Sequence, residues 1–125
     1  MKIIFIGIFG VLGIYSRYFI DTIISNNQNS LPISTLVANS IGCFLAGVIY
    51  CFISQKYQSV YLQPLLIGFC GGLTTFSSYS LQTLNLLSAE QSLKSLTYLI
   101  LSPTLGIIFV FIGLHLTLHL FFSQN

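Results

Sequence analysis

Charged residues are nearly absent from this sequence. Only 5% of its 125 residues are Asp, Glu, Lys or Arg, whereas about a quarter are charged in a typical soluble domain. The formal net charge is +2 and is scattered along the chain, so no basic surface for nucleic acid is expected. Together with the 54% of hydrophobic residues, this scarcity of charge indicates an integral membrane protein.

The sequence also lacks the patterns of zinc sites, disulfide frameworks and enzymes. Its cysteines lie inside apolar segments without paired spacing, so we interpret Cys43, Cys51 and Cys70 as small hydrophobic residues. His115 and His119 are four residues apart, a spacing that can bind a metal. No acidic or thiol partner is evident, and an interfacial pair is the favoured alternative. No nucleophile, base and orienting group occur together, and no enzyme is expected.

Four long apolar segments are present, each near the length of about 20 residues that a bilayer requires. The first begins as a signal peptide does, but it continues past Arg17 without a small-residue cleavage site, so we interpret it as a retained helix. We expect an all-α, multi-pass protein of the cell membrane. Residues 1–125 should form a single four-helix transmembrane domain, with helices at about 3–24, 34–53, 60–87 and 96–122.

The third segment contains an unusual run of glycines and hydroxyls, Gly68-Phe-Cys-Gly-Gly-Leu-Thr-Thr-Phe-Ser-Ser-Tyr-Ser80. Glycine inside a helix costs roughly 1 kcal/mol relative to alanine, and Ser and Thr offer the backbone competing hydrogen bonds. The run predicts a third helix broken at Gly71–Thr75. Broken backbone at membrane depth is tolerated where it is buried in protein or lines a watery cavity. We favour a site for an ion or small polar solute over a packing site of small residues.

The first two segments carry further polar residues. One face of the first segment holds residues spaced by three and four: Gly10, Gly13, Arg17 and Asp21. Arg17 and Asp21 can pair there, and a role for Arg17 in a pore vestibule or as a structural anchor stays open. In the second segment, the amide of Asn39 needs a partner in hydrocarbon. Asn39 therefore faces either another helix or a pore.

The few cations are evenly distributed between the two sides of the membrane. Four spans would place Lys2 and Lys56 on one side, and Lys94 with Arg17 near the other. The positive-inside rule then has almost no bias to act on. A chain without bias can insert both ways, and two opposed copies can form an antiparallel, dual-topology dimer. Four helices also enclose a polar path poorly, which favours an oligomer.

Three runs resemble the Fluc (CrcB) family of fluoride ion channels: Gly68 to Ser80, Thr35-Leu-Val-Ala-Asn-Ser-Ile-Gly42 and Gly10-x-x-Gly-x-x-x-Arg-Tyr18. The resemblance covers essentially the whole chain in length, span count and motif order. It implies passive fluoride export, which relieves fluoride toxicity, by an antiparallel dimer with two pores. It also implies a structural sodium ion at the dimer centre, held by backbone carbonyls. The matching positions are Gly71 and Thr74.

The resemblance also implies pore residues. Asn39 corresponds to the family's pore asparagine and Phe76 to the first phenylalanine of its aromatic box. Tyr98 and Ser102 match, in spacing, its polar track on the fourth helix. Tyr79 stands where the family usually has the second phenylalanine. This departure leaves a heterodimer with a paralogous chain as an alternative to a homodimer.

The chemistry of these residues agrees with fluoride as the ion. Fluoride is small and strongly hydrated, so a pore must replace its water with hydrogen-bond donors. Amide and hydroxyl donors are supplied by Asn39, Ser77, Ser78, Ser80 and Ser102, and the positive edge of an aromatic ring at Phe76 favours an anion. For the Tyr79 hydroxyl, we favour donation to fluoride over a bond to a neighbouring Ser or Thr that narrows the path.

Two other functions are compatible with this size and composition. A dual-topology multidrug exporter requires an ionisable carboxylate within the membrane, but Glu90 falls in a loop and Asp21 lies beside Arg17. A structural membrane subunit, whose small residues serve only helix packing, is the other alternative. Fluoride efflux from proteoliposomes separates all three.

Overall fold

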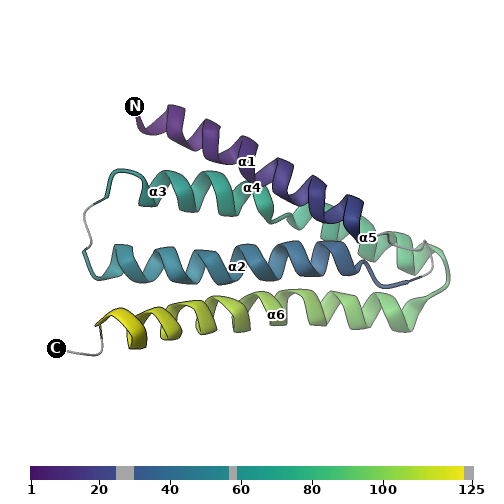
Figure 1. Ribbon diagram of the computed structural model, residues 1–125. Helices are drawn as coiled ribbons and strands as arrows, with labels where there is room; N and C mark the ends of the chain where they lie inside the picture. Colours follow the sequence, from purple (N-terminus) through teal and green to yellow (C-terminus); the bar gives the residue numbers. More distant parts are fainter. Residues whose placement is uncertain (25–29, 57–58, 123–125) are drawn as a thin grey trace.

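The computed structural model describes residues 1–24, 30–56 and 59–122, and all regular secondary structure in these ranges is helical. Three helices are long and apolar enough to cross a membrane: α1 (Lys2–Ile23), α2 (Ile33–Ser54), and α6 (Ser92–Thr117) with its π-helical continuation η2 (Leu118–Phe122). Figure 1 shows α2 and α6 side by side along their length, with α1 inclined to both. Residues 25–29, 57–58 and 123–125 lie outside the described residues, so the expected connections at 25–33 and 54–59 are described only in part.

The third expected span is interrupted. It consists of α3 (Leu62–Pro64), the π-helical segment η1 (Leu65–Cys70), α4 (Gly71–Leu73) and, after a break, α5 (Phe76–Ser88). Thr74 and Thr75 are extended, with ψ angles of 151° and 120°. The break thus falls inside the predicted stretch, but at its two threonines, while the glycine pair remains helical.

Two glycines of this span, Gly68 and Gly72, allow close packing against α1. A Cβ on Gly72 would stand 2.6 Å from the carbonyl oxygen of Gly10, and a Cβ on Gly13 would collide with the carbonyl oxygen of Phe69. Such backbone-to-backbone approach is how membrane helices pack where lipid removes the hydrophobic driving force between them. Small-residue packing and a broken helix therefore occur in the same run, but at different residues.

This packing predicts that alanine destabilises the protein at Gly13 but not at Gly7. Gly13→Ala is expected to destabilise the protein by roughly 1–3 kcal/mol, because the added methyl group meets backbone rather than a movable side chain. Gly7→Ala is the control, since a Cβ there meets nothing within 4 Å and alanine is the better helix former by about 1 kcal/mol. Thermal unfolding of the purified protein in detergent measures both. Equal unfolding temperatures would contradict the close approach of α1.

The connection between α5 and α6 is shorter than the Ser88–Ser95 loop expected from the sequence. Residues 89–91 form a tight turn in which Glu90 has a positive φ of 60°. The N–H groups of Ala89, Glu90 and Gln91 donate to carbonyls of the last turn of α5. These bonds close the end of α5, so α6 begins four residues earlier than the expected residue 96.

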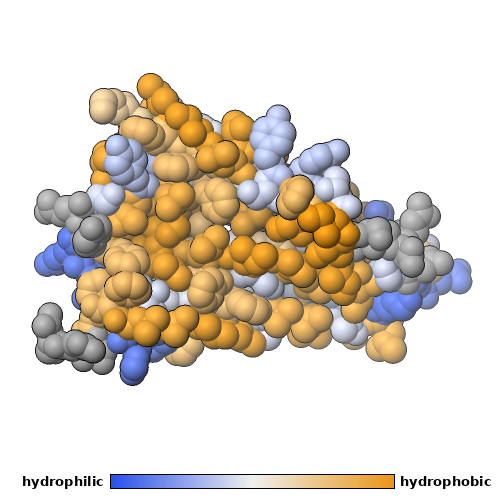
Figure 2. All heavy atoms as spheres, viewed as in Figure 1, coloured by the Kyte–Doolittle hydropathy of each residue, from blue (hydrophilic) through white to orange (hydrophobic). Residues whose placement is uncertain are grey.

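The surface suits lipid rather than water. Large apolar side chains are exposed along every long helix, including Ile3, Leu93 and Ile107 at 83%, 79% and 72%. Figure 2 shows apolar residues over the middle of the visible face and hydrophilic residues gathered at its two ends. Exposed apolar surface of this extent marks a membrane or partner contact.

Candidate functional site

Asn39 binds the break from the neighbouring helix α2. Its side-chain oxygen accepts a hydrogen bond of 2.8 Å from the backbone N–H of Thr75, and its amide nitrogen donates to the Thr75 carbonyl at 3.4 Å. Because the Thr75 N–H is a donor, the amide oxygen must face it, which sets the orientation of the whole amide. One hydrogen of the Asn39 NH₂ group then remains for another acceptor. The Asn39 side chain thus binds the extended backbone and still has one N–H that can donate to another group.

Thr75 caps the N-terminus of α5. Its hydroxyl oxygen accepts from the Ser78 N–H at 3.1 Å, and the hydroxyl is also bonded to the side chains of Ser77 and Ser78 at 3.1 and 3.2 Å. Ser80 donates to the Phe76 carbonyl one turn back at 2.9 Å. Three of the four serines expected as fluoride donors, Ser77, Ser78 and Ser80, thus make hydrogen bonds at the start of α5, where Thr75 is the N-cap.

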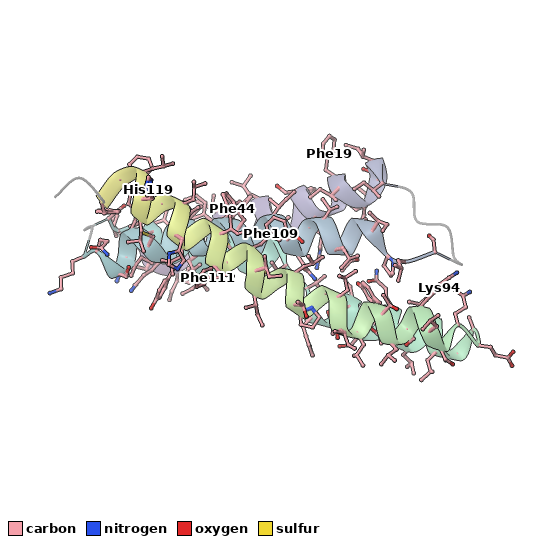
Figure 3. The ribbon with its side chains drawn as sticks, turned by 90° about the horizontal axis from the view of Figure 1, so that it is seen from below. Phe19, Phe44, Lys94, Phe109, Phe111 and His119 are labelled. Atoms are coloured by element: carbon pink, nitrogen blue, oxygen red, sulfur yellow. The ribbon has the colours of Figure 1, made fainter. Side chains whose placement is uncertain are left out.

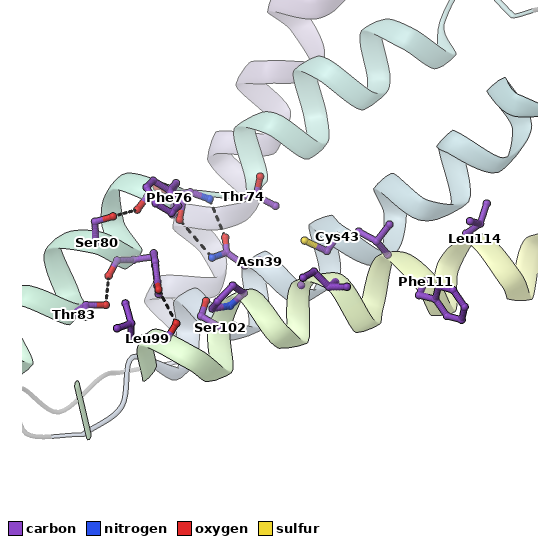
Figure 4. Close-up of a pocket in the computed structure, with 16 residues that line it drawn as sticks. Asn39, Cys43, Thr74, Phe76, Ser80, Thr83, Leu99, Ser102, Phe111 and Leu114 are labelled. Carbon is purple, nitrogen blue, oxygen red and sulfur yellow. Dashed lines mark hydrogen bonds between the residues drawn. The ribbon is translucent and has the colours of Figure 1, made fainter. Parts of the chain in front are cut away.

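A groove of about 930 Å³ opens beside the break. Its lining residues come from α2, the break, α5 and α6 (Figure 4). The lining is mainly apolar, and its polar side chains come from the break and from all three helices: Asn39, Thr74, Thr75, Tyr79, Ser80, Thr83 and Ser102. Of the residues expected in a pore, the groove brings together Asn39, Phe76, Tyr79, Ser80 and Ser102. Ser77, Ser78 and Tyr98 do not line it.

The aromatic residues form a row from the surface into the core. Phe76 is 79% exposed, Tyr79 is 8% exposed and Tyr98 is fully buried. The Phe76 and Tyr79 ring centroids lie 5.5 Å apart, and those of Tyr79 and Tyr98 lie 5.4 Å apart, with tilted planes. Phe76 therefore presents its ring at the open side of the groove, while Tyr79 is held between two other rings.

The Tyr79 hydroxyl has a partner that the sequence did not indicate. It donates to the backbone carbonyl of Leu99 in α6 at 2.8 Å, rather than to a neighbouring Ser or Thr. The hydroxyl was expected to donate to an anion, but in the structure it donates to the backbone. The reason is a tertiary contact between α5 and α6 that no local pattern reveals.

Ser102 is different from the other serines. It is 7% exposed and lines the groove from α6 (Figure 4). Its hydroxyl makes no hydrogen bond to any part of the chain that the structure describes. Because Ser102 lines the groove, its hydroxyl is accessible there rather than sealed in the core. Ser102 is therefore the serine of this groove that is ready to bind a polar solute.

A second polar cluster was missed at the sequence level. Gln82 of α5 donates to Thr35 of α2 at 2.9 Å and accepts from the Tyr98 hydroxyl of α6 at 2.8 Å. These bonds join three helices through buried or half-buried side chains, so Tyr98 serves as a link between helices rather than as a groove residue. The signal that points to Gln82 is its position three residues after Tyr79, on the same face of α5.

The break frees backbone carbonyls at the positions that the family resemblance gave for a sodium ion. The Thr75 N–H, which would bond Gly71 in a continuous helix, donates to Asn39 instead. The Ser78 N–H, which would bond Thr74, donates to Thr75. Gly71 is exposed, and a Cβ there would meet nothing within 4 Å. Freed carbonyls at a broken helix are suitable ligands for sodium, so Gly71 and Thr74 fit the expected ion.

Other candidate residues lie away from the groove. Arg17 is half-buried on α1, makes no ion pair with Asp21, and does not line the groove. His115 packs its ring on Phe111, with centroids 4.0 Å apart, and Figure 3 shows His119 near one end of the molecule. Within residues 1–24, 30–56 and 59–122, no three His, Cys, Asp or Glu side chains form a metal-binding group.

An apolar exterior, long apolar helices and a polar break define a multi-pass membrane protein with a groove suited to a small solute. The chain matches the family described as CrcB-like protein, Camphor Resistance (CrcB), over residues 4–114, and it belongs to that family. A Fluoride-specific ion channel FluC 1 of Streptococcus pneumoniae is 40% identical over 114 residues, covering 91% of this chain and 98% of the relative.

Other relatives agree. The Fluoride-specific ion channel FluC of Francisella philomiragia is 34% identical over 92% of this chain and 93% of its own. FluC 2 of Listeria innocua is 34% identical, covering 90% of this chain and 88% of the relative. These relatives are named as ion channels and not as enzymes, which agrees with the sequence analysis.

Proposed function

We propose that this protein is a fluoride-selective channel that lets fluoride leave the cell passively and so relieves fluoride toxicity. The observation that carries the proposal is a groove with two donors and a ring: the spare N–H of Asn39, the unpartnered hydroxyl of Ser102 and the exposed ring of Phe76. Donors of this kind replace the water of a small anion. The names of the relatives supply the identity of the anion.

The donors differ in role from the sequence-level expectation. Asn39 and Ser102 contact the ion, and the edge of Phe76 favours its negative charge. Ser77, Ser78 and Ser80 shape the route by fixing the start of α5, and Tyr98 fixes α6 through Gln82. The acidic residues that an exporter of cationic drugs would need do not line the groove, which favours the channel.

The working unit is an antiparallel dimer of four-span subunits, the interrupted segment counting as the third span. Figure 1 shows the N-terminus and the end of α6 at one end of the molecule, as four spans require. The exposed Phe76 and the open side of the groove support coverage by a second copy. The numbered names FluC 1 and FluC 2 among the relatives support a paralogous partner as the alternative.

A sodium ion at the dimer centre completes the proposed assembly. The carbonyls of Gly71 and Thr74, freed from their helical donors, would hold it. Bound there, the ion supplies a fixed positive charge among backbone oxygens. The open space around Gly71 supports this position, because it leaves room for the ion and for the partner subunit.

Fluoride efflux from proteoliposomes tests the proposed function. The purified chain alone is expected to release fluoride with negligible chloride release, because residues 36–52 and 62–87 contain no lysine or arginine that would attract anions in general. A fluoride-selective electrode and a chloride electrode follow the two ions in matched vesicles. Chloride efflux comparable to that of fluoride would contradict the pore assignment.

The proposed dimer predicts a mixed orientation in the membrane. A single cysteine introduced at Ser30, in a chain with the three native cysteines replaced, is expected to react with an impermeant reagent from both sides. The reason is the two-against-two balance of Lys2 and Lys56 against Lys94 and Arg17. Labelling from one side only would point to an oppositely oriented partner chain.

A further inference from the structure

Pro103 removes one backbone hydrogen bond from α6. It lies inside the helix, and proline has no N–H to donate to the carbonyl four residues back. That carbonyl belongs to Leu99. In hydrocarbon, where no water replaces the lost donor, an unsatisfied carbonyl costs several kcal/mol. The sequence alone gives no sign of what satisfies it.

Tyr79 supplies the missing donor from another helix. Its hydroxyl donates to the Leu99 carbonyl at 2.8 Å, and its ring is 8% exposed between Phe76 and Tyr98. A phenol has one proton to donate. A hydroxyl committed to Leu99 therefore cannot also donate to an anion in the groove. Phenylalanine at this position would keep the ring but leave the carbonyl without a donor.

We infer that Tyr79 and Pro103 act as a pair in which Tyr79 is a positioning residue. The Tyr79–Leu99 bond ties α5 to α6 beside the groove and fixes the ring against which Phe76 packs. The tyrosine is needed in this chain because α6 carries the proline. Only the effect on flux rests on the proposed fluoride function; the coupling between Tyr79 and Pro103 is a property of the fold.

Four variants test the pair: the parent, Tyr79→Phe, Pro103→Ala and the double variant. In Pro103→Ala, the new N–H at residue 103 bonds Leu99 and makes the tyrosine hydroxyl dispensable. Tyr79→Phe alone is expected to lower the unfolding temperature and to slow fluoride efflux about fivefold to tenfold, as loss of one buried hydrogen bond does. On the Pro103→Ala background, the same change should alter efflux by less than about twofold. Tyr15→Phe, at a 68% exposed tyrosine, is the control.

Two results of the efflux assay would overturn the inference. An equal loss of efflux on both backgrounds, with unchanged unfolding, would mean that the hydroxyl donates to fluoride directly. Faster efflux in Tyr79→Phe would mean that the hydroxyl obstructs the groove. If Pro103→Ala yields no dimer, Pro103→Leu supplies the same backbone N–H. If the parent does not conduct fluoride, the proposed function fails, and the cycle of unfolding temperatures still decides whether the two residues are coupled.

Discussion

Asn39→Leu is expected to abolish fluoride efflux, with a loss of about a hundredfold or more, equivalent to about 2.7 kcal/mol in the barrier. Leucine has a similar volume but removes both functions of the amide. The Thr75 N–H loses its acceptor, and the groove loses the spare N–H. The unfolding temperature should fall as well, because the extended backbone at the break is then unsatisfied in hydrocarbon. Efflux assays and thermal unfolding in detergent measure the two effects.

Asn39→Asp separates the two functions. A carboxylate oxygen still accepts from the Thr75 N–H, but the bond to the Thr75 carbonyl is lost, so the break should persist and the unfolding temperature should fall less than in Asn39→Leu. Efflux should nevertheless be lost, because the carboxylate has no N–H and repels an anion. Ser40→Ala, one residue further along α2 and outside the groove lining, is the matched control. Efflux by Asn39→Asp at the parent's rate would assign Asn39 to the break alone.

Phe76→Ile is expected to remove most fluoride transport, by about tenfold or more, while the protein still folds and keeps the same assembly as the parent. The Phe76 ring is 79% exposed within one subunit, so little intramolecular packing depends on it. Isoleucine keeps a large apolar side chain but lacks the positive ring edge that favours an anion. Fluoride efflux together with size-exclusion chromatography separates loss of transport from loss of assembly.

Phe19→Ile on α1 provides the control for this change. Phe19 is also largely exposed, at 64%, but it does not line the groove. The same substitution there should leave efflux unchanged. If both variants conduct like the parent, Phe76 is only a packing residue, and the ring has no part in anion selection.

The sequence predicted the helices and the break because these depend on local composition. Apolar length fixes where a span fits the bilayer, and the glycine and hydroxyl run weakens one helix at a particular place. The exact site of the break could not be predicted from the sequence. Gly72 stays helical and packs closely against α1, whereas the backbone of Thr75 is extended and bound by Asn39 of α2. Both contacts are tertiary.

The sequence predicted several residues that line the groove but not the hydrogen-bond partners of the candidate site residues. Asn39, Phe76 and Ser102 came from family resemblance and residue chemistry, and the groove contains all three. Ser77 and Ser78 were expected to donate to an ion because their hydroxyls follow the break. Their hydroxyls instead form hydrogen bonds with the hydroxyl of Thr75, the N-cap of α5. Whether a hydroxyl is free depends on what lies within about 3 Å of it, which the order of residues does not reveal.

The break also has an electrical consequence. A helix carries about half a positive elementary charge at its N-terminus and half a negative one at its C-terminus. Dividing the third span exposes the C-terminal end of α4 and the N-terminal end of α5 within a few residues of each other at Thr74 and Thr75. The partial negative end holds the freed carbonyls, which attract a cation, and the partial positive end faces the groove beside Phe76. The sodium ion and the fluoride that we propose would thus both be stabilised at membrane depth by the peptide backbone, without a single charged side chain.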